Sequence, residues 1–186
     1  AATAMGRELG VPFARMAEAL RGFHGAERRY QLRGAVSGVT VVDDYGHHPT
    51  EIAAVLRTAR EGAPGRLVVA FQPHRYSRTR DLMADFGPAL GLADVVVLTD
   101  IYAASEAPIP GISLESLAAT IRPHVKELVL VPSVGDVAAH VALLAQPGDL
   151  VVTLGAGSIG HVADRIVALL QQMASSSAGA TGQVVS

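Results

Sequence analysis

Apolar positions along the chain follow two alternating patterns. Short uninterrupted runs rich in valine and leucine predict buried strands at residues 39–42, 67–71, 95–99, 128–131 and 150–154. Between them, apolar residues spaced three or four apart predict helices at residues 50–60, 79–90, 113–121, 134–144 and 159–173. Helices that alternate with strands act as crossovers between parallel strands. The pattern therefore predicts an α/β fold with a mostly parallel sheet and helices on both faces.

Three segments depart from this alternation. Residues 1–23 carry a helical pattern from the start, and the chain begins at Ala1 without a methionine, so we expect a piece of a longer protein. Residues 174–186 are small and polar without periodicity, which predicts a disordered tail. Gly87-Pro88 interrupts the helical segment 79–90, which predicts a kink or a break there.

Composition narrows the class of protein. Of the 186 residues 49% are apolar and 17% are charged, which is typical of a globular chain. A net charge of −2 argues against nucleic acid or an anionic membrane as a partner. The absence of cysteine excludes disulfides, thiolate catalysis and cysteine-ligated zinc. No apolar run reaches the roughly 18 residues that cross a bilayer, and we expect a cytoplasmic protein.

Unusual polar motifs follow four of the predicted strands. They read DDYGHHP, QPHRYSRTR, DIYAASEAPIPG and GAGSIG, whereas the loops at the other ends of the strands, such as EGAPG and AQPGD, are ordinary turn sequences. The carboxyl ends of parallel strands meet at one edge of the sheet, where ligands bind. The sequence therefore predicts a polar site at this edge.

The first motif combines a carboxylate with aromatic and imidazole groups. Asp44 at a strand end is suited to bind ribose hydroxyls, with Tyr45 and His47 beside it to contact a base or a phosphate. In the alternative interpretation Asp44 only ends a strand and His48 only caps the next helix. The spacing of the histidines does not predict a metal site, because neither HxH nor HxxxH occurs there.

The second motif gathers basic side chains at a helix start: His74, Arg75, Arg78 and Arg80. The helix dipole disfavours cations at that position. An anion bound between the guanidinium groups and the helix N–H groups would explain the placement. Alternatively, these arginines form surface ion pairs with Asp81 or Asp85.

The other two motifs leave their roles open. The loop with Tyr102 and Glu106 either receives an amino group or is simply an acidic, solvated loop. GAGSIG fits the G-x-G-x-x-G pattern of dinucleotide sites, but the acidic residue expected about 20 residues later is absent. Gly155 and Gly157 therefore either admit a ligand or allow a helix to pack closely on a strand.

Together with FHGAERRYQ, these motifs occur in an order and spacing that resembles the C-terminal part of the Mur ligase family. Within that family the resemblance is to the members that join L-alanine to UDP-N-acetylmuramate. The family implies an N-terminal domain for the UDP-sugar, a central ATPase with a P-loop and a C-terminal Rossmann-like domain. We therefore expect residues 1–30 to be a remnant of the central domain and the hinge, 31–173 to be the C-terminal domain and 174–186 to be the tail.

The resemblance also implies a reaction and partners. ATP phosphorylates the lactyl carboxylate of UDP-N-acetylmuramate, and the amine of L-alanine attacks the resulting acyl phosphate. The N-terminal and central domains of the same chain complete the site, and the central domain holds most of the magnesium contacts. We expect this sequence alone to be inactive. Three alternatives stay open: a muropeptide-recycling ligase domain, a dinucleotide-binding oxidoreductase domain and a non-catalytic binding module.

Residue roles come from the same resemblance. It implies ATP binding by Arg29, Asp44 and Tyr45, and catalytic roles for His47, Arg75 and Arg78. It implies substrate binding by five further residues: His74, Tyr102, Glu106, Gly155 and Gly157.

Overall fold

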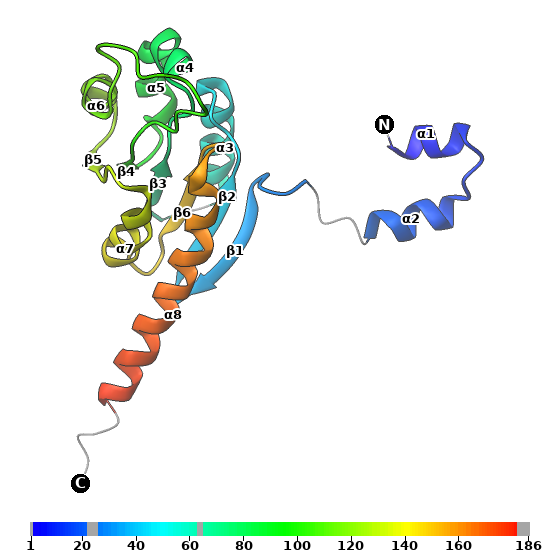
Figure 1. Ribbon diagram of the computed structural model, residues 1–186. Helices are drawn as coiled ribbons and strands as arrows, with labels where there is room; N and C mark the ends of the chain where they lie inside the picture. Colours follow the sequence, from blue (N-terminus) through cyan, green and yellow to red (C-terminus); the bar gives the residue numbers. More distant parts are fainter. Residues whose placement is uncertain (1, 22–25, 63–64, 182–186) are drawn as a thin grey trace.

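A six-stranded sheet forms the centre of the molecule. The computed structural model describes residues 2–21, 26–62 and 65–181 (Figure 1). Its strands are β1 (Gln31–Val36), β2 (Val39–Asp44), β3 (Leu67–Phe71), β4 (Val95–Leu98), β5 (Glu127–Leu130) and β6 (Leu150–Leu154). They lie in the order β1-β2-β6-β3-β4-β5, and all neighbours are parallel except β1 and β2. The predicted mostly parallel sheet is confirmed.

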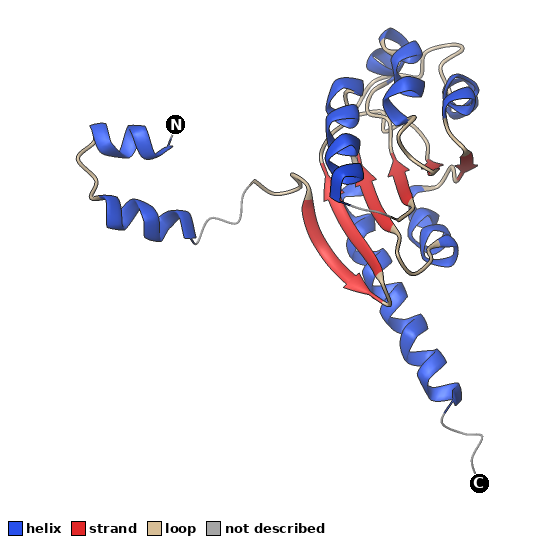
Figure 2. Cartoon of the chain, turned by 180° about the vertical axis from the view of Figure 1, so that it is seen from behind, coloured by secondary structure: helices blue, strands red, loops and turns tan. Residues whose placement is uncertain are grey.

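Helices cover both faces of this sheet (Figure 2). The helices are α1 (Ala2–Glu8), α2 (Phe13–Arg21), α3 (Pro49–Gly62), α4 (Tyr76–Asp81), α5 (Met83–Leu90), α6 (Leu114–Ile121), α7 (Val134–Leu144) and α8 (Val162–Thr181). Two short 3₁₀ turns, η1 (Arg122–His124) and η2 (Ser158–His161), complete the described elements. Helices α3, α5 and α6 contribute to one apolar cluster, and α7 and α8 to the other. The α/β class is confirmed.

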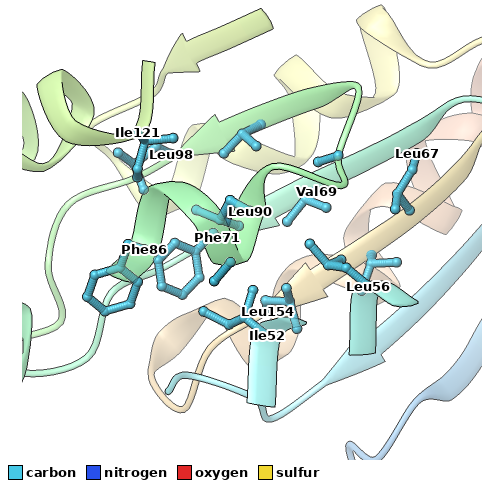
Figure 3. Close-up of a cluster of buried hydrophobic side chains, with 14 of the residues drawn as sticks. Ile52, Leu56, Leu67, Val69, Phe71, Phe86, Leu90, Leu98, Ile121 and Leu154 are labelled. Atoms are coloured by element: carbon cyan, nitrogen blue, oxygen red, sulfur yellow. The ribbon is translucent and has the colours of Figure 1, made fainter. Parts of the chain in front are cut away.

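Strand β3 is buried on both faces of the sheet, which is why its sequence is a continuous apolar run rather than an alternation of apolar and polar residues. Side chains of a strand point to opposite faces in turn, so Val69 and Phe71 enter one cluster and Val68 and Ala70 the other. All four are fully buried. Figure 3 shows the first cluster, in which the Phe71 ring lies 5.6 Å from the Phe86 ring. Burial of each large side chain contributes roughly 1.5–3 kcal/mol to folding.

The predicted break at Gly87-Pro88 is wrong. The helix is interrupted at Leu82, where φ is −115° and ψ is 15°, and Pro88 lies inside α5. Gly87 has a packing role instead, because a Cβ there would lie 2.7 Å from the carbonyl oxygen of Thr120 and 2.4 Å from the His124 ring. The glycine therefore lets α5 approach α6 and η1 closely.

Helix α8 extends beyond the expected boundary at residue 173 and ends at Thr181. The Oγ atoms of Ser175 and Ser176 each donate a hydrogen bond to the carbonyl four residues earlier, at 2.9 Å. The serine hydroxyls thus form their hydrogen bonds within the helix rather than competing with it.

Residues 182–186 of the expected tail, and Phe23 of the expected N-terminal helix, lie outside the described residues. The proposed domain boundaries stay predictions.

Candidate functional site

A cleft of about 580 Å³ lies where β2 and β3 end. It is lined by Tyr45, His47, His48, His74, Arg75, Ser77, Arg78, Asp81 and Leu82. These side chains come from the loop after β2, the segment after β3, helix α4 and Leu82, which follows α4. The first two polar motifs of the sequence therefore share one cleft at the carboxyl edge of the sheet.

A row of aromatic rings joins the cleft to the loop after β4. The ring of His47 lies 5.4 Å from Tyr45, edge to face, and 5.5 Å from His74. The ring of His74 stacks on Tyr102, also at 5.5 Å. The backbone reinforces this contact, because Tyr102 N–H donates to the Pro73 carbonyl at 2.9 Å. Three of the four predicted motifs therefore meet in one row.

The surroundings of His74 favour its neutral form. Arg78 Nη1 lies 3.2 Å from His74 Nδ1, and a guanidinium can only donate, so Nδ1 is the acceptor and the ring proton resides on Nε2. Burial lowers the pKa of His74 below its ordinary value, and electrostatic interactions with the neighbouring His47, Arg78 and Arg75 lower it further. The clustered positive charge makes this cleft suited to an anion such as a carboxylate or a phosphate.

Arg75 and Glu106 define the start of α4. Arg75 has φ of 73°, in the left-handed region that non-glycine residues rarely adopt, and its N–H donates to the Tyr102 carbonyl at 2.8 Å. The two carboxylate oxygens of Glu106 accept from Ser77 N–H at 2.9 Å and Ser77 Oγ at 2.7 Å. These bonds lower the pKa of Glu106, and its carboxylate lies 3.6 Å from Arg75 Nη1. Glu106 is thus engaged with α4 and Arg75.

The four basic side chains of the second motif have different partners. The expected surface ion pair exists for Arg80, which is bonded to Asp81 at 2.8 Å with both groups exposed. Arg78 faces His74 instead, and Arg75 is half-exposed beside Glu106. The surface ion-pair alternative therefore describes Arg80, while Arg75 and Arg78 line the cleft.

Asp44 and His48 both have structural partners. The Asp44 carboxylate is buried and accepts Gly46 N–H and Tyr30 N–H, each at 2.7 Å. His48 Nδ1 accepts Thr50 N–H at 3.3 Å and so caps α3. A carboxylate has about four acceptor positions, so Asp44 keeps acceptor capacity, but only 6% of its surface is exposed.

The glycines of GAGSIG serve close packing. Gly155 has φ of 141°, and a Cβ there would lie 2.7 Å from the Gln72 carbonyl oxygen. A Cβ at Gly157 would lie 2.6 Å from both Gln72 Oε1 and Tyr102 Cγ. Protein atoms thus occupy the space that a side chain would need at these two positions, and their binding of a substrate stays a prediction. Gln72, a buried polar residue, was not among the predicted site residues, and its signal in the sequence is its place between an apolar run and PHRYSRTR.

Two neighbouring arginines precede β1. Among the residues that the structure describes, the expected ATP ligand Arg29 is exposed and forms no hydrogen bond or ion pair. Arg28, which was not among the predicted site residues, pairs with Asp43 at 2.7 Å and lies over the Tyr45 ring. The adjacent pairs Arg28-Arg29 and Asp43-Asp44 were the signal in the sequence.

The described residues contain neither a cluster of metal-ligating side chains nor a helix that could span a membrane. Within residues 2–21, 26–62 and 65–181, no three histidine, aspartate or glutamate side chains converge so as to hold a metal ion. In the same ranges, each helix is too short or too polar to traverse a bilayer. The expected magnesium therefore lacks a complete donor set in this part of the chain.

Comparison with known proteins identifies the family. The family model "Mur ligase, glutamate ligase domain" matches residues 28–157. The chain belongs to the Mur ligase family. It is 51% identical over 172 residues to the UDP-N-acetylmuramate–L-alanine ligase of Anaeromyxobacter dehalogenans (strain 2CP-C), covering 92% of this chain and 38% of that one. Its identity to the ligase of the same name from Acidothermus cellulolyticus is 53% over 158 residues, covering 84% and 33%.

Solved structures of Mur ligases share this fold. The UDP-N-acetylmuramate-alanine ligase MurC of Thermotoga maritima superposes with a TM-score of 0.72 at 29% identity, over 91% of this chain and 36% of that one. A murein peptide ligase of Psychrobacter arcticus superposes with a TM-score of 0.65 at 24% identity, over 91% and 33%, which shows the fold alone. The chain thus spans little more than a third of the length of these Mur ligases.

Proposed function

We propose that this chain is the C-terminal domain of an ATP-dependent UDP-N-acetylmuramate–L-alanine ligase and that it carries the amino-acid half of the active site. Supporting this assignment are the relatives of that name, with 51% and 53% identity, and the family match that begins at residue 28. The observation that carries the proposal is the cationic cleft in which Arg78 and the half-exposed Arg75 lie beside His74. We place the reaction in the cytoplasm.

The proposed reaction forms an amide bond through an acyl phosphate. The γ-phosphate of ATP passes to the lactyl carboxylate of UDP-N-acetylmuramate, and the amine of L-alanine then attacks the acyl carbon and releases phosphate. Both the carboxylate of alanine and the departing phosphate are anions. Arg75 and Arg78 would bind such anions by charge-assisted hydrogen bonds, and His74 would donate from Nε2.

The neutral state of His74 matters for this role. A protonated His74 would repel the guanidinium of Arg78, which lies 3.2 Å from Nδ1. The neutral ring instead accepts from Arg78 and orients it, while His47 completes the row towards Tyr45. These groups position reactants, which is the main requirement of phosphoryl and acyl transfer.

The nucleotide half of the proposal rests on fewer contacts. Tyr45 is 41% exposed at the mouth of the cleft and is available to contact ATP. Asp44 would contribute through its remaining acceptor positions, and Arg29 from its exposed place before β1. Magnesium is assigned to the central domain, because a complete donor set is absent among the residues described for this chain.

Two of the alternative functions are less well supported. A muropeptide-recycling ligase is disfavoured by the identities of about half to ligases named for L-alanine. A dinucleotide-binding domain is disfavoured because the acidic residue expected after GAGSIG is absent from the sequence, and close packing against Gln72 and Tyr102 accounts for Gly155 and Gly157.

The test uses the full-length protein that contains this chain. Phosphate release is measured with ATP, UDP-N-acetylmuramate and L-alanine, omitting one component at a time, and the product is identified by mass. We expect release only with all three substrates and the mass of UDP-N-acetylmuramoyl-L-alanine. Activity with a peptide but not with L-alanine would assign the recycling reaction instead. The 186-residue chain alone serves as the inactive control.

A further inference from the structure

We infer that Arg28 is a positioning residue for the nucleotide half of the site, an inference that rests on the proposed ligase function. Its side chain and backbone fix the segment that carries Arg29 to the ends of β2 and β6, and its guanidinium supports the Tyr45 ring. Arg28 itself is directed into the domain and acts through Arg29 and Tyr45.

The side chain of Arg28 joins β2 to the loop that follows β6. Its Nε donates to Asp43 Oδ2 at 2.7 Å, and its Nη2 donates to the Gly155 carbonyl at 2.6 Å. Asp43 is only 1% exposed and also accepts from Thr153 Oγ1 at 2.6 Å. Because an unpaired buried carboxylate is costly, Arg28 is held firmly at this point.

The backbone around Arg28 is fixed on both sides of Arg29. The Arg28 carbonyl accepts Tyr45 N–H at 2.7 Å, and Tyr30 N–H donates to Asp44 at 2.7 Å. Arg28 and Tyr30 both adopt left-handed backbone conformations, with φ of 55° and 48°. The two flanking residues are thus anchored to the end of β2, and the direction of Arg29 follows from their geometry.

The guanidinium of Arg28 also supports the loops around it. Its Cζ lies 5.3 Å from the centre of the Tyr45 ring, within cation–π range. A Cβ at Gly160 would lie 2.8 Å from the same Cζ, so the last glycine of GAGSIG makes room for this side chain. A planar fork with several donors fits these contacts, and the single ammonium of a lysine does not.

A positioning role and a purely structural role predict different results. Arg28 contacts the end of β2, the loop after β6 and Tyr45, whereas the proposed alanine ligands His74, Arg75 and Arg78 have other partners. If Arg28 positions Arg29 and Tyr45, its loss weakens ATP binding and spares alanine. If it only stabilises the fold, both substrates are affected together with the melting temperature.

The experiment compares full-length wild type with Arg28→Met and Arg28→Lys. Binding of a non-hydrolysable ATP analogue is measured by calorimetry, and KM for ATP and for L-alanine by phosphate release. We expect Arg28→Met to raise Kd and KM for ATP about tenfold, with KM for L-alanine changed less than about twofold. Arg28→Lys restores part of the loss. The matched control is Arg33→Met, which removes the exposed ion pair with Asp164 and leaves both KM values unchanged.

Other outcomes overturn the inference. Unchanged ATP binding in Arg28→Met contradicts it, as does an equal rise of both KM values with a lower melting temperature. If wild type binds ATP but forms no product with L-alanine, the proposed function fails while the calorimetry still decides the role of Arg28. A full-length protein that binds no ATP overturns both.

Discussion

Arginines at the two edges of the sheet have different surroundings. At the edge where the strands begin, Arg66 donates to both oxygens of Asp149, and Arg60 donates to Asp94 and to the carbonyls of Gly65 and Leu92. At the edge where the strands end, Arg75 is half-exposed and has one carboxylate partner 3.6 Å away. Arg66 and Arg60 are thus neutralised internally where the strands begin, whereas Arg75 is left available to a ligand where the strands end.

The pKa directions at the two edges agree with this difference. Burial raises the pKa of Asp94, but hydrogen bonds from Lys126, Leu67 N–H and Arg60 outweigh burial and lower it well below its ordinary value. At the other edge burial and neighbouring positive charges act together to lower the pKa of His74. Asp94 is therefore surrounded by opposite charges at the edge where the strands begin, whereas His74 lies among side chains that carry an excess of positive charge in the cleft.

The largest expected effect comes from removing Arg75. In the full-length protein, Arg75→Ala is expected to lower kcat/KM about 10²–10³-fold, because the charged donor proposed for the reacting anion is lost. Its unfolding free energy is expected to change by less than about 0.5 kcal/mol, since the side chain is half-exposed. Steady-state phosphate release and urea unfolding measure the two quantities. Activity close to wild type would remove Arg75 from the site.

The matched change at the other edge has the opposite signature. Arg66→Ala leaves the buried Asp149 without its ion-pair partner and is expected to lower the unfolding free energy by about 2–3 kcal/mol. The kcat/KM per folded molecule is expected to stay within about twofold of wild type. A large loss of activity at full folding would show that the two edges are not functionally separate.

Glu106 tests how Arg75 is oriented. Glu106→Gln keeps an acceptor for Ser77 but loses the charge beside Arg75, so we expect kcat/KM to fall about tenfold with little change in melting temperature. Glu106→Ala is expected to lose more, because Ser77 N–H then lacks its partner. If Glu106→Gln raises only KM for L-alanine at unchanged kcat, Glu106 binds the substrate amine directly instead.

The smallest effect concerns the titration of His74. Because its pKa is lowered, the folded protein binds fewer protons at this site than the unfolded chain, so the site's contribution to stability falls as pH drops below about 6.5. Arg78→Met removes a positive neighbour, and saturating phosphate adds an anion, so each is expected to raise the pKa of His74. NMR titration of the histidine rings measures it. A lower or unchanged pKa in both cases would contradict the cationic character of the cleft.

The sequence predicted the buried elements well because their signal is local. Residues 67–71, 134–144 and 150–154 were placed as β3, α7 and β6 with the observed bounds. The interruption at Leu82 was missed because Pro88 is the stronger local signal, whereas the role of Gly87 depends on α6 and η1. Local patterns do not contain such contacts between distant segments.

The candidate site was predicted as a place rather than as a set of contacts. The rule for parallel sheets located the four motifs at one edge, but it did not distinguish Arg28 from Arg29, which differ in backbone conformation and not in type. Nor did it reveal that Glu106 bonds to Ser77, 29 residues earlier in the chain. Long-range hydrogen bonds decide which side chains remain available, and a single sequence does not encode them in any short pattern.

His74 and Tyr102 form an isolated parallel β-bridge, and this backbone pairing has a practical consequence for protein engineering. Two backbone hydrogen bonds tie the segment after β3 to the loop after β4 beyond the ends of both strands. Substitutions in one of these segments will therefore alter the other, and their effects will not add. Directed-evolution libraries aimed at a substrate other than the proposed L-alanine will need to randomise both segments in the same clones, because improved variants will arise as combinations rather than as separate steps.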